Sequence, residues 1–82
     1  MEKLQIDVIQ PLAKIGHAAS NKWQRENHHP PYPEWNELME IDRVLRCERV
    51  EKILKGEHEE LLGEELAFAK AITEKANEWH LL

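Results

Sequence analysis

The chain has 82 residues, a formal net charge of −5 and one cysteine, Cys47. A chain of this length forms a single domain with a thin core. A lone cysteine excludes an internal disulfide, which is typical of a reduced intracellular protein. No apolar run approaches the roughly 20 residues that a membrane-spanning helix needs, so the sequence predicts a cytoplasmic protein that does not enter a membrane.

The acidic residues are concentrated in the last third of the chain. Residues 57–82 carry two basic and seven acidic side chains. A protein that binds duplex nucleic acid needs a basic face that displaces counterions from the phosphates, so direct nucleic-acid binding is not expected. Docking of an acidic surface on a basic protein partner is compatible with these charges.

The first expected helix covers residues 7–26. Asp7 and Gln10 have the spacing of a capping box, and Pro11 is then expected in the first turn, where its missing N–H costs nothing. Gly16 either lets another helix approach closely or weakens this helix. The apolar residues that form one stripe at spacings of three and four are Val8, Leu12, Ile15, Ala19 and Trp23.

A stiff proline-rich loop over residues 27–33 separates this helix from the next, because its three prolines remove backbone donors and favour extended conformations. The second helix is expected over residues 34–55. Its apolar residues wrap more than one side of a helical wheel, which predicts either the central helix of three or a helix in the interface of a homo-oligomer. These residues are Trp35, Leu38, Met39, Ile41, Val44, Leu45, Val50, Ile53 and Leu54.

The third helix is expected over residues 57–79, after Gly56 ends the second. Gly63 interrupts its pattern, so the helix begins either before or after this glycine. The sequence therefore predicts an all-α fold. It is a small three-helix bundle in which helices two and three form an antiparallel hairpin, and it is expected to be oligomeric because so short a chain has a thin core.

Polar and aromatic residues around the loop are the candidates for ligand binding. His17 and Asn21 share one face of the first helix, which is either a solvated face or a ligand-facing wall beneath the loop. The aromatic residues either stack on a small ring or fill the core, and nearby arginines would contact a phosphate. The candidate residues are His17, Trp23, Arg25, His28, His29, Tyr32, Trp35 and Arg43. The histidines lack the spacing of a zinc site, and the sequence has no Gly-rich phosphate loop, Ser/His/Asp order or Cys/His nucleophile pattern, so no catalytic residue, metal or cofactor is assigned.

Residues 12–54 contain His17, His29-Pro30, Pro33-Glu34-Trp35, Leu38, Asp42-Arg43 and Ile53-Leu54 in an order that resembles a ryanodine-receptor-type (RyR) repeat. The family's Gly-Trp-x-Tyr-Gly segment is missing, and Ser20 stands where the family has Asn or Trp. The resemblance implies a non-enzymatic module, of a kind found in phage proteins, that binds or sequesters a nucleotide-like or other small anionic ligand near His17, Tyr32 and Trp35.

A second resemblance concerns the acidic residues Glu37, Glu40, Glu60 and Glu64. Together with the stretch Gly63-Glu64-Glu65-Leu66-Ala67-Phe68, they are similar to the metal-binding motifs of all-α nucleoside triphosphate pyrophosphatases. The metal-binding Asp of that family is absent near Ala67 and Phe68, so a relative of this kind would be inactive. The sequence thus leaves three hypotheses: a small-ligand binding module, an acidic protein-interaction module or inhibitor that docks on a basic partner, and a degenerate pyrophosphatase.

Overall fold

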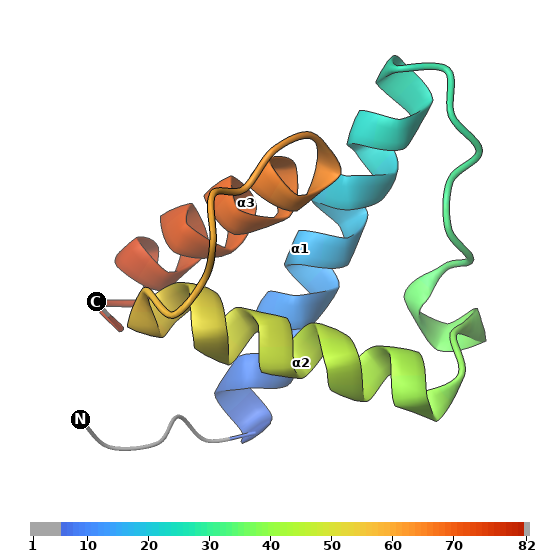
Figure 1. Cartoon of the computed structure of the whole chain (residues 1–82). Coiled ribbons are helices and arrows are strands. Elements are labelled where there is room, and N and C mark those ends of the chain that lie inside the picture. The colour runs from blue at the N-terminus through green and yellow to red at the C-terminus, as the bar shows by residue number, and fades with distance from the viewer. Residues whose placement is uncertain (1–5, 82) are drawn as a thin grey trace.

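The structure is a computed structural model that describes residues 6–81. It contains α1 (Ile6–Glu26), a short 3-10 helix η1 (Trp35–Glu37), α2 (Glu40–Lys55) and α3 (Glu64–Glu78) (Figure 1). No strand occurs in this part of the chain, so the prediction of an all-α fold with three helices is confirmed. No helix within it is long and apolar enough to cross a membrane.

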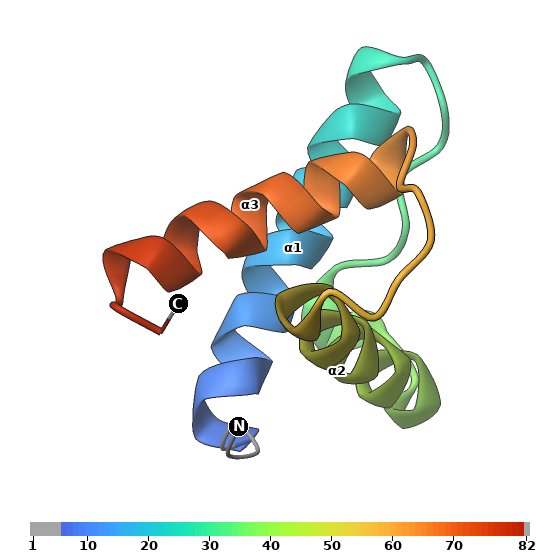
Figure 2. The same cartoon turned by 60° about the vertical axis from the view of Figure 1, so that its left-hand side comes forward.

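Helix α1 is the centre of the bundle. Figures 1 and 2 show α3 crossing one side of α1 while α2 packs against another side. The most extensive pairing is α1 with α3, and α2 touches α3 only slightly. The predicted hairpin of helices two and three is therefore not the main helix pair. Both α2 and α3 pack chiefly on α1.

The second predicted helix is divided into two elements. Leu38 and Met39 have extended backbones (ψ 147° and 151°), which separate η1 from α2. The break turns both Trp35 and Leu38 into the core, where they are 9% and 7% exposed. The prediction of a continuous helix over residues 34–55 is therefore wrong. The extended backbone of Leu38 and Met39 interrupts it, and Arg43 of α2 donates to the Leu38 carbonyl at the break.

Glycines mark both ends of the connection between α2 and α3. Gly56 is left-handed (φ 74°) and donates its N–H to the Ile53 carbonyl, as expected of a residue that ends a helix. Gly63 also has a positive φ, 62°, with ψ −132°, a conformation that is accessible essentially to glycine alone. Because no helix can pass through this conformation, α3 begins after Gly63, and residues 57–62 are not helical.

The buried face of α1 differs from the predicted stripe. Ile9, Leu12 and Ala13 are almost fully buried, whereas four of the five stripe residues, all but Leu12, are only half-buried. Asp7 lies inside the first turn rather than at the cap, and Pro11 lies inside the helix, so the predicted capping box is not the start of α1. The face that is buried depends on where α2 and α3 pack, which periodicity alone does not determine.

Gly16 is a point of close approach between α1 and α3. A Cβ at this position would lie 2.6–2.7 Å from three ring atoms of Phe68, a fully buried residue of α3. The absence of a side chain therefore lets the Phe68 ring lie against the α1 backbone. Of the two alternatives for Gly16, close helix approach is the one that the structure contains.

Candidate functional site

The proline-rich loop is held on α1 by two buried side chains that are one helical turn apart. His17 Nε2 lies 2.7 Å from the Pro33 carbonyl oxygen, within hydrogen-bond distance. Asn21 Oδ1 accepts the Tyr32 N–H at 2.8 Å, and Asn21 Nδ2 donates to the Tyr32 carbonyl at 3.1 Å. Both side chains are only 2% exposed. This face of α1 is therefore not solvated, because the loop covers it and uses its polar groups in place of backbone partners.

The imidazole of His17 is hydrogen-bonded through both nitrogens. Arg46 Nε donates to His17 Nδ1 at 3.0 Å. Because a guanidinium has only donors, Nδ1 is the acceptor and Nε2 carries the proton that is donated to Pro33. Arg46 also donates to the Asp42 carbonyl at 3.1 Å, and its guanidinium lies over the Tyr32 ring, 5.3 Å from the ring centroid. These contacts join α2 to the loop.

Tyr32 extends the same network to α3. Its hydroxyl donates to Glu64 Oε1 at 2.9 Å, and Ser20 Oγ donates to the Glu64 carbonyl at 3.3 Å. The hydrogen bond to the Glu64 carboxylate, followed by burial, raises the pKa of Tyr32 above its ordinary value. Glu64 Oε2 is enclosed and has no hydrogen-bond partner among residues 6–81. The hydrogen bonds of this network run from α1, α2 and α3 to the loop, so they hold the loop in place.

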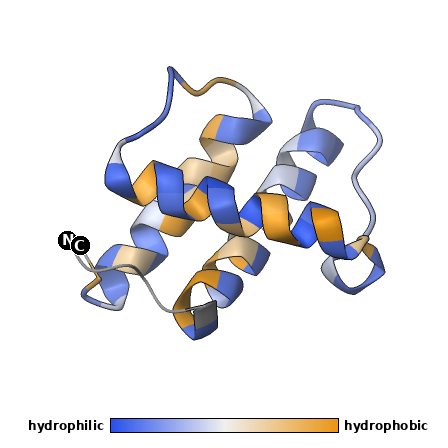
Figure 3. Cartoon of the chain, turned by 60° about the horizontal axis from the view of Figure 1, so that its bottom comes forward, coloured by the Kyte–Doolittle hydropathy of each residue, from blue (hydrophilic) through white to orange (hydrophobic). Residues whose placement is uncertain are grey.

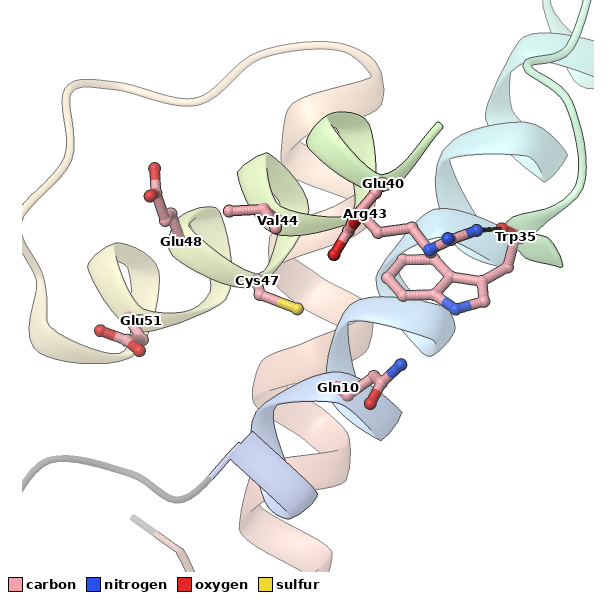
Figure 4. A pocket seen from close by; sticks show the side chains of 8 residues that line it. All are labelled: Gln10, Trp35, Glu40, Arg43, Val44, Cys47, Glu48 and Glu51. Atoms are coloured by element: carbon pink, nitrogen blue, oxygen red, sulfur yellow. Dashed lines mark hydrogen bonds between the residues drawn. The ribbon is translucent and has the colours of Figure 1, made fainter. Parts of the chain in front are cut away.

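The open groove beside this network lies between the first turns of α1, η1 and one flank of α2 (Figure 4). Its volume is about 570 Å³, within the range typical of small-ligand pockets. Trp35 closes one end, and the thiol of Cys47 points from α2 toward the space beside Gln10 of α1 (Figure 4). The residues that line the groove are Gln10, Trp35, Glu40, Arg43, Val44, Cys47, Glu48 and Glu51.

The charges around the groove are mostly negative. Glu40, Glu48 and Glu51 contribute three carboxylates, and Arg43 contributes the one guanidinium among the lining residues. Arg43 Nη1 donates to the Leu38 carbonyl at 2.7 Å and, more weakly, to the Trp35 carbonyl at 3.4 Å, so part of its hydrogen-bonding capacity is already used. The groove therefore combines an apolar wall with a local field that favours positively charged groups.

The eight predicted ligand-binding residues do not converge on one site. His17 and Tyr32 belong to the network beneath and within the loop. Trp35 and Arg43 lie at the groove. The T-shaped contact between the His17 and Trp35 rings, whose centroids are 6.0 Å apart, joins the two sites.

The other four predicted residues lie in the last turn of α1 and at the start of the loop. The Trp23 and His29 rings are stacked, with centroids 5.7 Å apart and planes 6° apart. Arg25 forms an exposed 3.5 Å ion pair with Glu34, and His28 is exposed with a positive φ of 60°. The sequence analysis grouped all eight predicted residues because they lie near the loop in the sequence. In the structure they are spread along the length of the loop.

Most contributors to these sites were not among the predicted ligand-binding residues, and Arg46, Glu64 and Gln10 are examples. Arg46 and Glu64 come from α2 and α3, and Gln10 comes from the start of α1. The spacing of His17 and Asn21 did signal a shared polar face. The partners of that face lie 11 to 44 residues away in the sequence, and no local pattern identifies partners at such separations.

The carboxylates of the pyrophosphatase hypothesis do not form a metal site. Glu37 lies in η1, Glu40 in α2, and Glu60 in the connection before α3. Glu64 is bonded to Tyr32. Within residues 6–81, no group of three or more His, Cys, Asp or Glu side chains is placed to hold a metal ion.

Cys47 provides a chemical probe of the groove. Burial, and secondarily the nearby Glu51 carboxylate, raises the pKa of its thiol. Because the thiolate is the nucleophile, we expect iodoacetamide to alkylate Cys47 severalfold more slowly in the folded protein than in the urea-unfolded protein at about pH 8. The sign follows from the raised pKa: the folded thiol needs a higher pH to reach the same thiolate fraction. Equal rates in a mass-spectrometric time course would contradict this prediction.

The resemblances to RyR repeats and to pyrophosphatases stay predictions. The function is inferred from the geometry of the groove and of the loop network. Comparison of the chain with protein-family models, with curated proteins and with solved structures finds no match.

Proposed function

We propose that this protein is a non-enzymatic binding module whose groove between α1, η1 and α2 takes a basic segment of a partner protein. The observation that carries the proposal is the pairing of an apolar wall, formed by Trp35 and Val44, with three carboxylates on the α2 side of the same groove. Of the hypotheses that the sequence left open, this is the acidic protein-interaction module, with the interaction surface moved from the chain's last third to α2.

Lys and Arg side chains match this combination of surfaces. Their aliphatic stems cover apolar surface while the charged head reaches toward water or a carboxylate. Val44 is 44% exposed, so it offers apolar surface to such a stem, and Glu40 and Glu48 are exposed beside it. His17, by comparison, has no free donor for a small anion, because both of its ring nitrogens are occupied.

A titration with an amphipathic Leu/Lys peptide tests this proposal. We expect binding that protects Cys47 from alkylation and shifts the backbone NMR signals of Gln10 and Val44. The triple variant Glu40→Gln/Glu48→Gln/Glu51→Gln should weaken binding roughly tenfold, since each partly exposed charge pair contributes about 0.5 kcal/mol.

The matched control removes the same number of charges elsewhere, through Glu57→Gln/Glu59→Gln/Glu60→Gln in the exposed connection before α3. This control should bind the peptide within about twofold of the parent chain, because distant exposed charges are screened at physiological salt. If the control loses as much affinity as the groove variant, the interaction surface is the acidic connection and the groove assignment is wrong.

A nucleotide-like ligand is the second candidate, and it rests on the presence of Trp35 and Arg43 in one groove. An aromatic ring and a guanidinium are groups that contact a base and a phosphate. ATP, ADP and AMP added singly should then raise the melting temperature, and Arg43→Gln should abolish the shift. Nucleotide binding without peptide binding would replace the first proposal with this one.

A further inference from the structure

The solvent-facing side of α2 carries an apolar patch in the half of the helix nearest η1. Ile41, Val44 and Leu45 are 58%, 44% and 52% exposed, and Met39, just before the helix, is 71% exposed. In Figure 3, α2 crosses the front of the view, and several positions along its ribbon have the hydrophobic colour. Contiguous exposed apolar side chains on one helix face are typical of a surface that another molecule covers.

The outward face of α2 also has the spacing of a helix-pairing seam. Ile41, Leu45, Glu48, Lys52 and Lys55 follow one another at intervals of four, three, four and three, and all five are exposed. This is the interval pattern of the contact positions in paired helices. The seam is apolar in its first half and charged in its second half, so it is not complementary to itself in a parallel arrangement.

The charges of α2 change sign along the helix. Its first turn contains Glu40 and Asp42, and its last turn contains Lys52 and Lys55. The ion pairs found within residues 6–81 are Arg25–Glu34 and Lys75–Glu78, neither of which involves α2. The Lys52 and Lys55 ammonium groups are therefore available to a carboxylate of another molecule.

We propose that the molecule covering this face is a second copy of the chain, with the two α2 helices packed antiparallel about a two-fold axis between Leu45 and Glu48. The antiparallel arrangement places the acidic first turn of each helix against the basic last turn of its partner, twice in the symmetric pair. The stem of Lys52 then covers Ile41 of the other copy, and Leu45 of each copy lies beside the axis, next to Glu48 of the other copy. A parallel pair would instead align like charges.

This interface is distinct from the groove, although it borders it. Ile41, Leu45, Lys52 and Lys55 do not line the groove, whereas Glu40, Val44 and Glu48 lie at the shared edge. The patch is short, so the contact falls in the smaller class of interfaces, for which a concentration-dependent dimer is expected. Leu45→Lys and Lys52→Glu/Lys55→Glu therefore test self-association without changing a residue that lines the groove.

Sedimentation equilibrium on the full chain, from about 5 to about 500 μM, tests the proposal in the range where small interfaces associate. The parent chain should shift from monomer to dimer, and Leu45→Lys should raise the dissociation constant at least tenfold. The matched control is Leu62→Lys, which changes a 69% exposed leucine outside α2 and should leave the dissociation constant unchanged. Circular dichroism verifies that each variant keeps its helical content.

Charge reversal tests the antiparallel register. Lys52→Glu/Lys55→Glu and Glu40→Lys/Asp42→Lys should each weaken self-association, because each places like charges together in an antiparallel pair. Mixing the two variants should restore a dimer that contains one copy of each. A parent chain that stays monomeric throughout, a dimer that survives Leu45→Lys, or a mixture that forms no heterodimer would each overturn the proposal.

Discussion

Replacing Gly16 with alanine is expected to destabilise the fold by about 2 kcal/mol, which is the scale of overpacking a filled core. In a solvent-exposed helix the same change would stabilise the protein by up to about 1 kcal/mol, because alanine is the better helix former. The sign is reversed here because the new Cβ would lie 2.6 Å from Phe68 Cε2. The Phe68 ring is fully buried, so it cannot move away without disturbing the contact between α1 and α3.

Thermal unfolding followed by circular dichroism measures this effect. For a domain of 60–100 residues, 1 kcal/mol corresponds to roughly 4–8 °C in Tm, so Gly16→Ala should lower Tm by about 8–16 °C. Ala18→Gly, at an exposed position of the same helix, measures the propensity effect alone and should cost about 1 kcal/mol. Gly16→Ala combined with Phe68→Leu should lose less stability than the sum of the two changes, since the smaller side chain makes room for the methyl group. A Tm that rises in Gly16→Ala would show that this contact is not tight.

Replacing His17 with alanine is expected to cost about 2–4 kcal/mol, from a lost buried side chain and two unpaired hydrogen-bonding groups. The Pro33 carbonyl and Arg46 Nε both lose their partner when the imidazole is removed. The loop should then separate from α1 more often, because of its two anchors only Asn21 would remain. Trp35 packs edge-on against the His17 ring, so the end wall of the groove should also loosen.

Two measurements separate this local effect from a general loss of stability. Limited proteolysis should cut the loop over residues 27–34 faster in His17→Ala than in a variant of equal Tm altered elsewhere, and hydrogen exchange of the Tyr32 N–H should accelerate. His28→Asn is the matched control, because His28 is exposed at a positive φ and asparagine tolerates that conformation. Unchanged loop proteolysis in His17→Ala would mean that Asn21 alone holds the loop.

The local elements follow from short-range sequence signals. The prolines at positions 30, 31 and 33 exclude a helix between residues 27 and 33, and Gly56 ends α2 because it alone adopts the left-handed conformation at low cost. These effects act within one or two turns of the chain, so the helical class, the position of the loop and the end of α2 could be predicted without tertiary information.

The arrangement of the site is decided by packing instead. His17 was compatible with a solvated face, and it is buried only because the loop, anchored through Pro33 and Tyr32, folds back on α1. Arg46 completes this network from a position 29 residues away. The interruption at Leu38 and Met39 likewise involves a contact across the break, from the Arg43 guanidinium to the Leu38 carbonyl. Sequence periodicity indicates which residues can share a helix face. Which face becomes buried depends on how the three helices pack around a small core, and only the tertiary structure determines that packing.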